Sequence, residues 1–252
     1  MAIIGDEIQQ YVQEQINARQ KAHGSGVPGL DFEGRTLEEL TYLNSKTSFI
    51  TLASGVKVSE KKLVDLGFSD SAKRSLYKGS GLAKNHILFG GYAKYTSPSS
   101  NPNSQDGTVS QRTKFLGDNG AYQFFEDSGI LPMPGIISLN VKNLNRGSIK
   151  KASLKIKVES RQQLAIIDTL YLRLGYTVLL EWGNSVYLDN SNNIRKQDNT
   201  IINKESFWSP KTDTGYDKIL GNIETLRSSR NGNYDGLLGT ITNFNWSFID
   251  DG

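Results

Sequence analysis

The strongest constraint in this sequence is the stretch Ser160–Trp182, in which a helix with clear boundaries runs directly into an apolar strand. Ser160 and Gln163 form a capping-box pair, which starts a helix. The apolar residues after Ser160 recur at helical spacing, and Gly175 suits the left-handed conformation that ends many helices. Tyr176–Trp182 then reads YTVLLEW, the composition of a buried strand. The chain must therefore pack a helix of about residues 160–174 against a sheet that contains this strand.

Two half-buried strands precede that helix. Apolar residues alternate with polar ones over residues 136–142 and again over 150–159, and the turn NLNRGS joins the two runs. We expect an antiparallel hairpin, with the strand at 176–182 beside it in one sheet. The expected fold class is α+β, mainly antiparallel β, in the form of a β-barrel or sandwich crossed by the helix.

Further elements are expected on both sides of this unit. Residues 47–58 are typical of an extended segment, and Ser59 of the N-cap of a helix that ends at Gly67. Toward the end of the chain we expect a polar loop at 189–215, a helix over 216–230 and a strand over 237–249. That strand would place Thr242, Phe244, Trp246 and Phe248 on one face.

The chain divides into three parts by composition. Residues 1–30 hold a helix with a narrow apolar stripe that includes Ile8 and Val12, followed by a linker. This helix docks either on its own domain or on a neighbouring subunit, and we favour the neighbour. Residues 31–120 are a mixed segment with a long polar loop at 96–120, and 121–252 form the β domain. The terminal Asp251-Gly252 is a favoured turn pair, so we expect more chain to follow.

Composition argues against most catalytic and metal chemistry. The chain has no cysteine and only two histidines, His23 and His86, so thiolate nucleophiles and histidine-rich metal sites are excluded. We interpret both histidines as structural and expect no enzymatic activity, no cofactor and no metal. No apolar stretch approaches the roughly 20 residues that cross a membrane.

Three motif matches fail for lack of context. Gly24–Gly29 has the letters of a dinucleotide fingerprint but contains Pro28 and opens no helix. Asp189–Thr200 begins like a calcium loop, but Ile194 and Thr200 stand where the loop needs Gly and Glu. Glu126 and Asp127 are an adjacent carboxylate pair in an aromatic setting, and neighbours in sequence point apart, so a solvated turn is favoured.

A local concentration of positive charge lies in the hairpin and its flanks. The whole chain has 29 basic and 26 acidic residues, a net charge of only +3, which does not by itself predict nucleic-acid binding. A positive stripe that faces a lumen, DNA or an acidic partner is one interpretation, and an ordinary solvated sheet face is favoured over it. Within a basic run that also includes Lys142, Arg146 and Arg161, the residues proposed for this stripe are Lys150, Lys151, Lys155 and Lys157.

These segments resemble the baseplate hub and hub-like tail proteins of tailed bacteriophages, which are also similar to the hubs of contractile injection systems. The resemblance rests on Pro-Met-Pro-Gly-Ile at 132–136, Gly-Ser at 147–148, Gln-Gln-Leu at 162–164 and LGYTVLLEWG at 174–183. It covers about residues 47–183 and again ITNFNWSF at 241–248, and it is a pattern of architecture rather than of an active site.

The resemblance implies a tube-like domain in a ring around the tail axis, with a helical N-terminal decoration. The expected function is structural, in the virion, after synthesis in the host cytoplasm. The expected partners are copies of itself in a trimer or hexamer, tube and spike proteins, and transiently DNA or a tape-measure protein, with no membrane. A hub normally carries two tube-like domains, and this chain is short for that. The expected inter-subunit anchors are Ile8, Val12, Tyr176, Trp182 and Trp246.

Two alternatives from other classes remain open. The first is a tail-associated cell-wall or polysaccharide hydrolase that uses Glu126 and Asp127. The second is a carbohydrate-binding module with Trp182, Trp208 and Trp246 as stacking platforms.

Overall fold

The structure is a computed structural model, in which the chain divides into two compact units, Met1–Asn44 and Ser45–Gly252. The described residues all belong to the second unit. The expected N-terminal helix with Ile8 and Val12 and the polar loop at 96–120 lie outside the described residues. The structure describes residues 48–91, 122–125, 129–144, 149–188, 194–196, 200–202, 206–208, 215–230 and 232–248.

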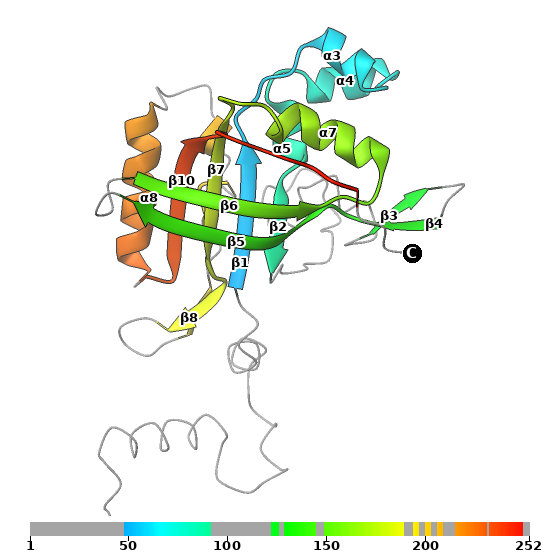
Figure 1. Cartoon of the computed structure of the whole chain (residues 1–252). Helices are drawn as coiled ribbons and strands as arrows, with labels where there is room; N and C mark the ends of the chain where they lie inside the picture. The colour runs from blue at the N-terminus through cyan, green and yellow to red at the C-terminus, as the bar shows by residue number, and fades with distance from the viewer. Residues whose placement is uncertain are drawn as a thin grey trace, which may run out of the picture. The chain divides into compact units, whose positions relative to one another are not determined.

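A four-stranded antiparallel sheet lies at the centre of the unit (Figure 1). Its strands, in spatial order, are β10 (Tyr234–Thr240), β7 (Thr177–Asn184), β1 (Ser48–Ser54) and β2 (Leu88–Gly91). β1 and β2 precede residue 120 in the chain and β7 and β10 follow it, so this sheet spans the boundary expected there. The predicted strands at 47–58 and 176–182 are confirmed, and they are direct neighbours, with Leu52 opposite Leu180.

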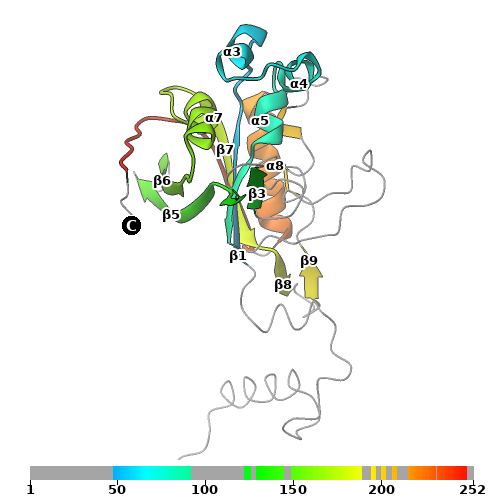
Figure 2. The same cartoon turned by 90° about the vertical axis from the view of Figure 1, so that its right-hand side faces the viewer.

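The predicted hairpin is present, but it does not extend this sheet. β5 (Gly135–Leu144) and β6 (Ile149–Lys157) form their own two-stranded sheet. The expectation that the strand at 176–182 lies beside them is therefore wrong. Both edges of β7 are already paired, with β1 and with β10. The hairpin therefore packs its apolar side onto one face of the sheet, where it helps to bury the middle residues of β7. Figure 2 shows the hairpin on one side of the sheet and the helix α8 (Tyr216–Ser229) on the other.

The predicted starts of the helices after Ser59 and Ser160 are confirmed, but the helix after Ser160 ends earlier than predicted. The Ser160 side chain accepts from the Gln163 N–H at 3.1 Å, and α7 runs over Arg161–Tyr171. Gly175 has φ of 81°, as the expected helix stop requires, although the helix itself ends four residues earlier. α3 (Glu60–Asp65) starts at Ser59, whose side chain accepts from Lys62 N–H. The remaining elements are α4 (Ser71–Tyr77), α5 (Gly81–Asn85), β3 (Tyr122–Phe125), β4 (Gly129–Pro132), β8 (Val186–Leu188), β9 (Ile194–Lys196), η3 (Ser206–Trp208) and α8 (Tyr216–Ser229).

Both faces of the central sheet are buried in separate apolar clusters. On one face Leu52 and Leu180 pack with α7, the short helices and the inner face of the β5–β6 hairpin. On the other face Phe49 and Leu179 pack with Ile223 of α8 and its neighbours. The unit is therefore layered, with hairpin and α7, then sheet, then α8 (Figure 2).

The last strand is shorter than predicted and shifted toward the N-terminus. β10 covers Tyr234–Thr240, and residues 241–248 form no strand. The Ile241 N–H donates to Tyr176 O at 3.0 Å, and the Gly175 N–H donates to Ile241 O at 2.8 Å. Gly175 and Tyr176 immediately precede the first residue of β7. Residues after Ile241 therefore have no part of β7 beside them to pair with, and the strand pairing ends there.

The coarse fold class is confirmed: the unit is α+β with antiparallel sheets. Among the described residues, however, the sheets do not close into a barrel.

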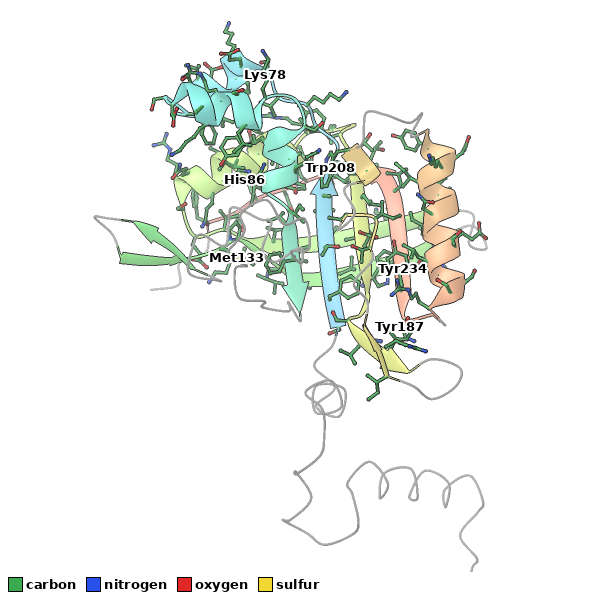
Figure 3. All side chains as sticks on the ribbon, turned by 180° about the vertical axis from the view of Figure 1, so that it is seen from behind. Lys78, His86, Met133, Tyr187, Trp208 and Tyr234 are labelled. Atoms are coloured by element: carbon green, nitrogen blue, oxygen red, sulfur yellow. The ribbon has the colours of Figure 1, made fainter. Side chains whose placement is uncertain are left out.

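Glu181 is a fully buried carboxylate in the middle of β7. Its two oxygens accept from the Ile201 N–H at 2.8 Å, the Ile202 N–H at 2.9 Å and the Tyr234 hydroxyl. Figure 3 labels Tyr234 beside α8. Burial raises the pKa of Glu181 above its ordinary value of 4.5, while the donated hydrogen bonds act in the opposite direction. The side chain ties the segment at 200–202 to the sheet.

We predict that Glu181→Ala lowers the free energy of unfolding by about 2–5 kcal/mol, because the buried groups that donate to this carboxylate lose their acceptor. Tyr234→Phe, which removes one donor, is expected to cost about 1 kcal/mol. Urea unfolding at neutral pH measures both. An equal loss in the two variants would contradict the shared-acceptor explanation.

The raised pKa of Glu181 predicts a pH dependence of definite sign. The folded state binds this proton more tightly than the unfolded state, so the contribution of Glu181 to stability increases as pH falls toward 4.5. Relative to Glu181→Gln, which has no such proton to bind, the unsubstituted protein should therefore gain stability between neutral pH and 4.5. Parallel urea titrations at several pH values in this range test the sign, and a falling difference would refute it.

Candidate functional site

The outward side of the β5–β6 hairpin presents a mostly polar and basic surface. Strand alternation and the observed register place four cross-strand pairs on it. All of these residues are exposed, and Lys142 stands directly opposite Lys151. We call this surface the outer hairpin face: Ser138, Asn140, Lys142, Leu144, Ile149, Lys151, Ser153 and Lys155.

The structure divides the predicted basic stripe between two faces. Lys150 has the same strand parity as Leu154 and Ile156, which pack in the core, so it points to the inner side of the hairpin. There its ammonium lies 3.2 Å from Asp235 of β10. Lys151 and Lys155 remain together on the outer side. Lys157 continues that row, but its ammonium pairs with Glu159 at 3.2 Å.

Asp235 connects three layers of the unit. It lies on β10 and accepts from Lys150 of the hairpin and from Arg227 Nε of α8, the latter at 2.8 Å. Burial alone would raise the pKa of Asp235, but the hydrogen bonds from Arg227, from the Gly236 N–H and from Lys150 together lower it. The carboxylate is therefore ionised at neutral pH, with a cation on each side of the sheet.

Exposed apolar side chains gather at the ends of the hairpin. Leu144 and Ile149 face each other as the last pair before its turn, and both are exposed. Ile137 is also exposed, at the irregularity in β5 between Ile136 and Ser138. Exposed β-branched and leucine side chains on a hairpin tip are available for contact with another molecule.

The segment at 241–248 has three exposed aromatic side chains. Its exposed fractions rise from 37% for Phe244 to 63% for Trp246 and 86% for Phe248. The Trp246 and Phe248 rings contact each other edge to face, with centroids 5.3 Å apart. We call these three residues the aromatic row.

The three predicted anchors that the structure describes differ in their exposure. Tyr176 is half-buried, with its backbone oxygen bonded to Ile241. Trp182 is half-buried and packs in the core cluster that holds the inner hairpin face, so it anchors the hairpin within its own unit. Only Trp246 is exposed, while Ile8 and Val12 lie outside the described residues.

The three tryptophans do not form one stacking platform. Trp208 is buried on the α8 side of the sheet, and its indole N–H donates to Ser54 O at 2.7 Å (Figure 3). Trp182 packs on the opposite side of the sheet. A carbohydrate surface would therefore have to rely on Trp246 alone.

The remaining sequence candidates divide as follows. His86 is buried, its Nδ1 lies 2.8 Å from Leu82 O and its ring contacts Tyr77, so its structural interpretation is confirmed. His23, Glu126 and Asp127 lie outside the described residues, as does most of Asp189–Thr200. In the part of the chain that the structure describes, no cluster of three or more His, Asp or Glu side chains could hold a metal. No described helix is both long and apolar enough to cross a membrane.

No model of a known protein family matches the sequence, and no curated protein or solved structure matches it significantly.

Sequence reasoning missed several residues that organise the site. The parity of Lys150 with Leu154 was a usable signal, since alternation alone places it on the apolar side. The importance of Asp235 and Glu181 had no comparable local signal, because their partners are distant in sequence. The pairing of Lys142 with Lys151 follows from the turn length, which the sequence alone does not fix.

We predict that Asp235→Asn lowers the free energy of unfolding by about 1 kcal/mol at neutral pH, because both ion pairs are partly exposed. Since the folded pKa lies below the ordinary 3.8, this contribution is present above 3.8 and is lost as pH falls through the folded pKa. Urea unfolding at neutral and strongly acidic pH measures the difference. Glu60→Gln, at an exposed ion pair with Lys78, is the control and should have almost no effect.

Proposed function

We propose that this chain is a structural subunit of a bacteriophage tail, similar to baseplate hub proteins, and that copies of it assemble into a ring around a central channel. In this proposal it acts in the virion without catalysing a reaction, as a trimer or hexamer that contacts tube and spike proteins. The observation that carries the proposal is the aromatic row, which exposes Trp246 and Phe248 on a segment that forms no strand. The sequence resemblance described above sets the kind of assembly.

The aromatic row has the chemistry of an interface centre. Trp and Phe are enriched where protein partners meet, and a few such residues supply most of the binding free energy. Single exposed apolar residues are common on soluble proteins, whereas large aromatic rings in contact with each other present a continuous apolar area to solvent. Burial of that area against a second copy would remove it from water.

The hairpin supplies a second way to join copies. No described strand is hydrogen-bonded to the outward edge of either β5 or β6. Unpaired strand edges are templates for pairing with another chain. In the proposed ring, the tube-like barrel would be completed by hairpins of neighbouring copies, with the apolar tip residues Leu144 and Ile149 in the seam.

Ring assembly is the function that the described surface supports best. The hydrolase alternative depends on Glu126 and Asp127, which lie outside the described residues, so no observed geometry supports it. The carbohydrate-binding alternative depends on three tryptophans, of which two pack inside the unit on opposite sides of the sheet.

Size-exclusion chromatography with light scattering on the full chain tests the proposal. We expect a trimer or hexamer whose population increases with protein concentration. The double variant Trp246→Ser/Phe248→Ser should weaken assembly by about 30-fold or more, the usual effect of losing an aromatic hot spot.

The matched control is Val64→Ser/Leu76→Ser, which removes two exposed apolar side chains from α3 and α4, with exposed fractions of 54% and 55%. It should assemble like the unsubstituted protein. A protein that stays monomeric at high concentration would overturn the proposal. Equal weakening by both double variants would show that the aromatic row is not the interface.

A further inference from the structure

The outer hairpin face concentrates positive charge that the rest of the described chain does not neutralise. Lys142, Lys151 and Lys155 are exposed, and none of them forms an ion pair with a described carboxylate. Lys150 and Lys157 differ, since each lies 3.2 Å from an acid. Of the lysines in the longer basic run, these three therefore lie exposed on the outer hairpin face without a described acidic partner.

The arrangement of these lysines works against the stability of the hairpin itself. Lys142 and Lys151 are directly opposite each other, and like charges in that position repel. Lys155 lies on the same face, four residues along β6, which at about 3.3 Å per residue is about 13 Å from Lys151. A negatively charged partner on this face would relieve the repulsion.

The residues between the lysines indicate the chemistry of that partner. Asn140 and Ser153 form the pair between the lysines, and Ser138 stands opposite Lys155. The eight residues of the face include no aromatic residue, Met or Arg. Protein interfaces are depleted in Lys and Ser and enriched in aromatic residues, Met and Arg, so an acidic protein is the poorer match. Lys, Ser and Asn are the side chains that contact phosphate oxygens of nucleic acids.

We propose that the outer hairpin face binds the phosphate backbone of double-stranded nucleic acid without reading its sequence. The roughly 13 Å span corresponds to about four base-pair steps of 3.4 Å, so the lysines can contact different phosphates of one duplex. Single-strand binding uses aromatic stacking, which this face does not offer, and lysine contacts to phosphate carry no sequence information. The proposal does not rest on ring assembly, although a ring would multiply the number of phosphates bound.

The test is the binding of a short labelled DNA duplex by the full chain, measured by fluorescence anisotropy at several salt concentrations between about 50 and 200 mM. The variant Lys142→Gln/Lys151→Gln/Lys155→Gln should bind at least about tenfold more weakly at the lowest salt. It should also lower the slope of log K against log salt by about 3, because each lysine removed leaves one phosphate with its counterion. Duplexes of different sequence should lose affinity equally.

The matched control is Lys57→Gln/Lys61→Gln/Lys73→Gln, which removes the same charge from exposed lysines elsewhere on the unit. It should keep both the affinity and the salt slope. Equal weakening by the two triple variants would reduce the effect to net charge and overturn the proposal, as would unchanged binding by the outer-face variant. Tighter binding of polyglutamate than of DNA would assign the face to an acidic protein instead.

The double variant Trp246→Ser/Phe248→Ser separates this proposal from ring assembly. If it is monomeric, its single chains should still show the difference in DNA binding between the two triple-lysine variants. If that difference is absent in the monomer, the face does not bind duplex on its own and the proposal fails, whatever the assembly measurements show.

Discussion

The need to cover β7 on all sides governs the rest of this structure. The strand has partners along both edges, and its central residues Leu179, Leu180 and Glu181 are buried. An apolar strand in this position needs a layer on each face, and the chain supplies α7 and the hairpin on one side and α8 on the other. The buried Glu181 adds a polar requirement, which the backbone at 200–202 and Tyr234 satisfy.

Features with local causes could be predicted from the sequence, and features with distant causes could not. Ser160 caps a helix because its partner, the Gln163 N–H, lies three residues away, and the positive φ of Gly175 is a local property of glycine. The neighbours of β7 depend on β1, which is far away in the chain, and the hairpin that is near in sequence covers it face to face. The end of β10 is likewise set by a contact between Ile241 and Tyr176. A repeated alternation predicts that a strand exists, but not which strand it will meet.

The same distinction applies to the candidate site. Composition indicated a basic hairpin, but only the register shows that Lys150 belongs to the interior and that Lys142 joins Lys151 on the outside. Trp182 was predicted to lie between subunits, because an aromatic residue at the end of a strand fits a subunit interface as well as an internal core. The cluster around it shows that it packs within its own unit.

Asp235 gives the layered architecture a mechanical property. Because one carboxylate holds Lys150 of the hairpin and Arg227 of α8, the hairpin is fastened through the edge of the sheet to the helix behind it. Tension applied to the hairpin therefore reaches α8 through this carboxylate as well as through the apolar core. Because both ion pairs are partly exposed, this link adds only a small resistance to that of the core.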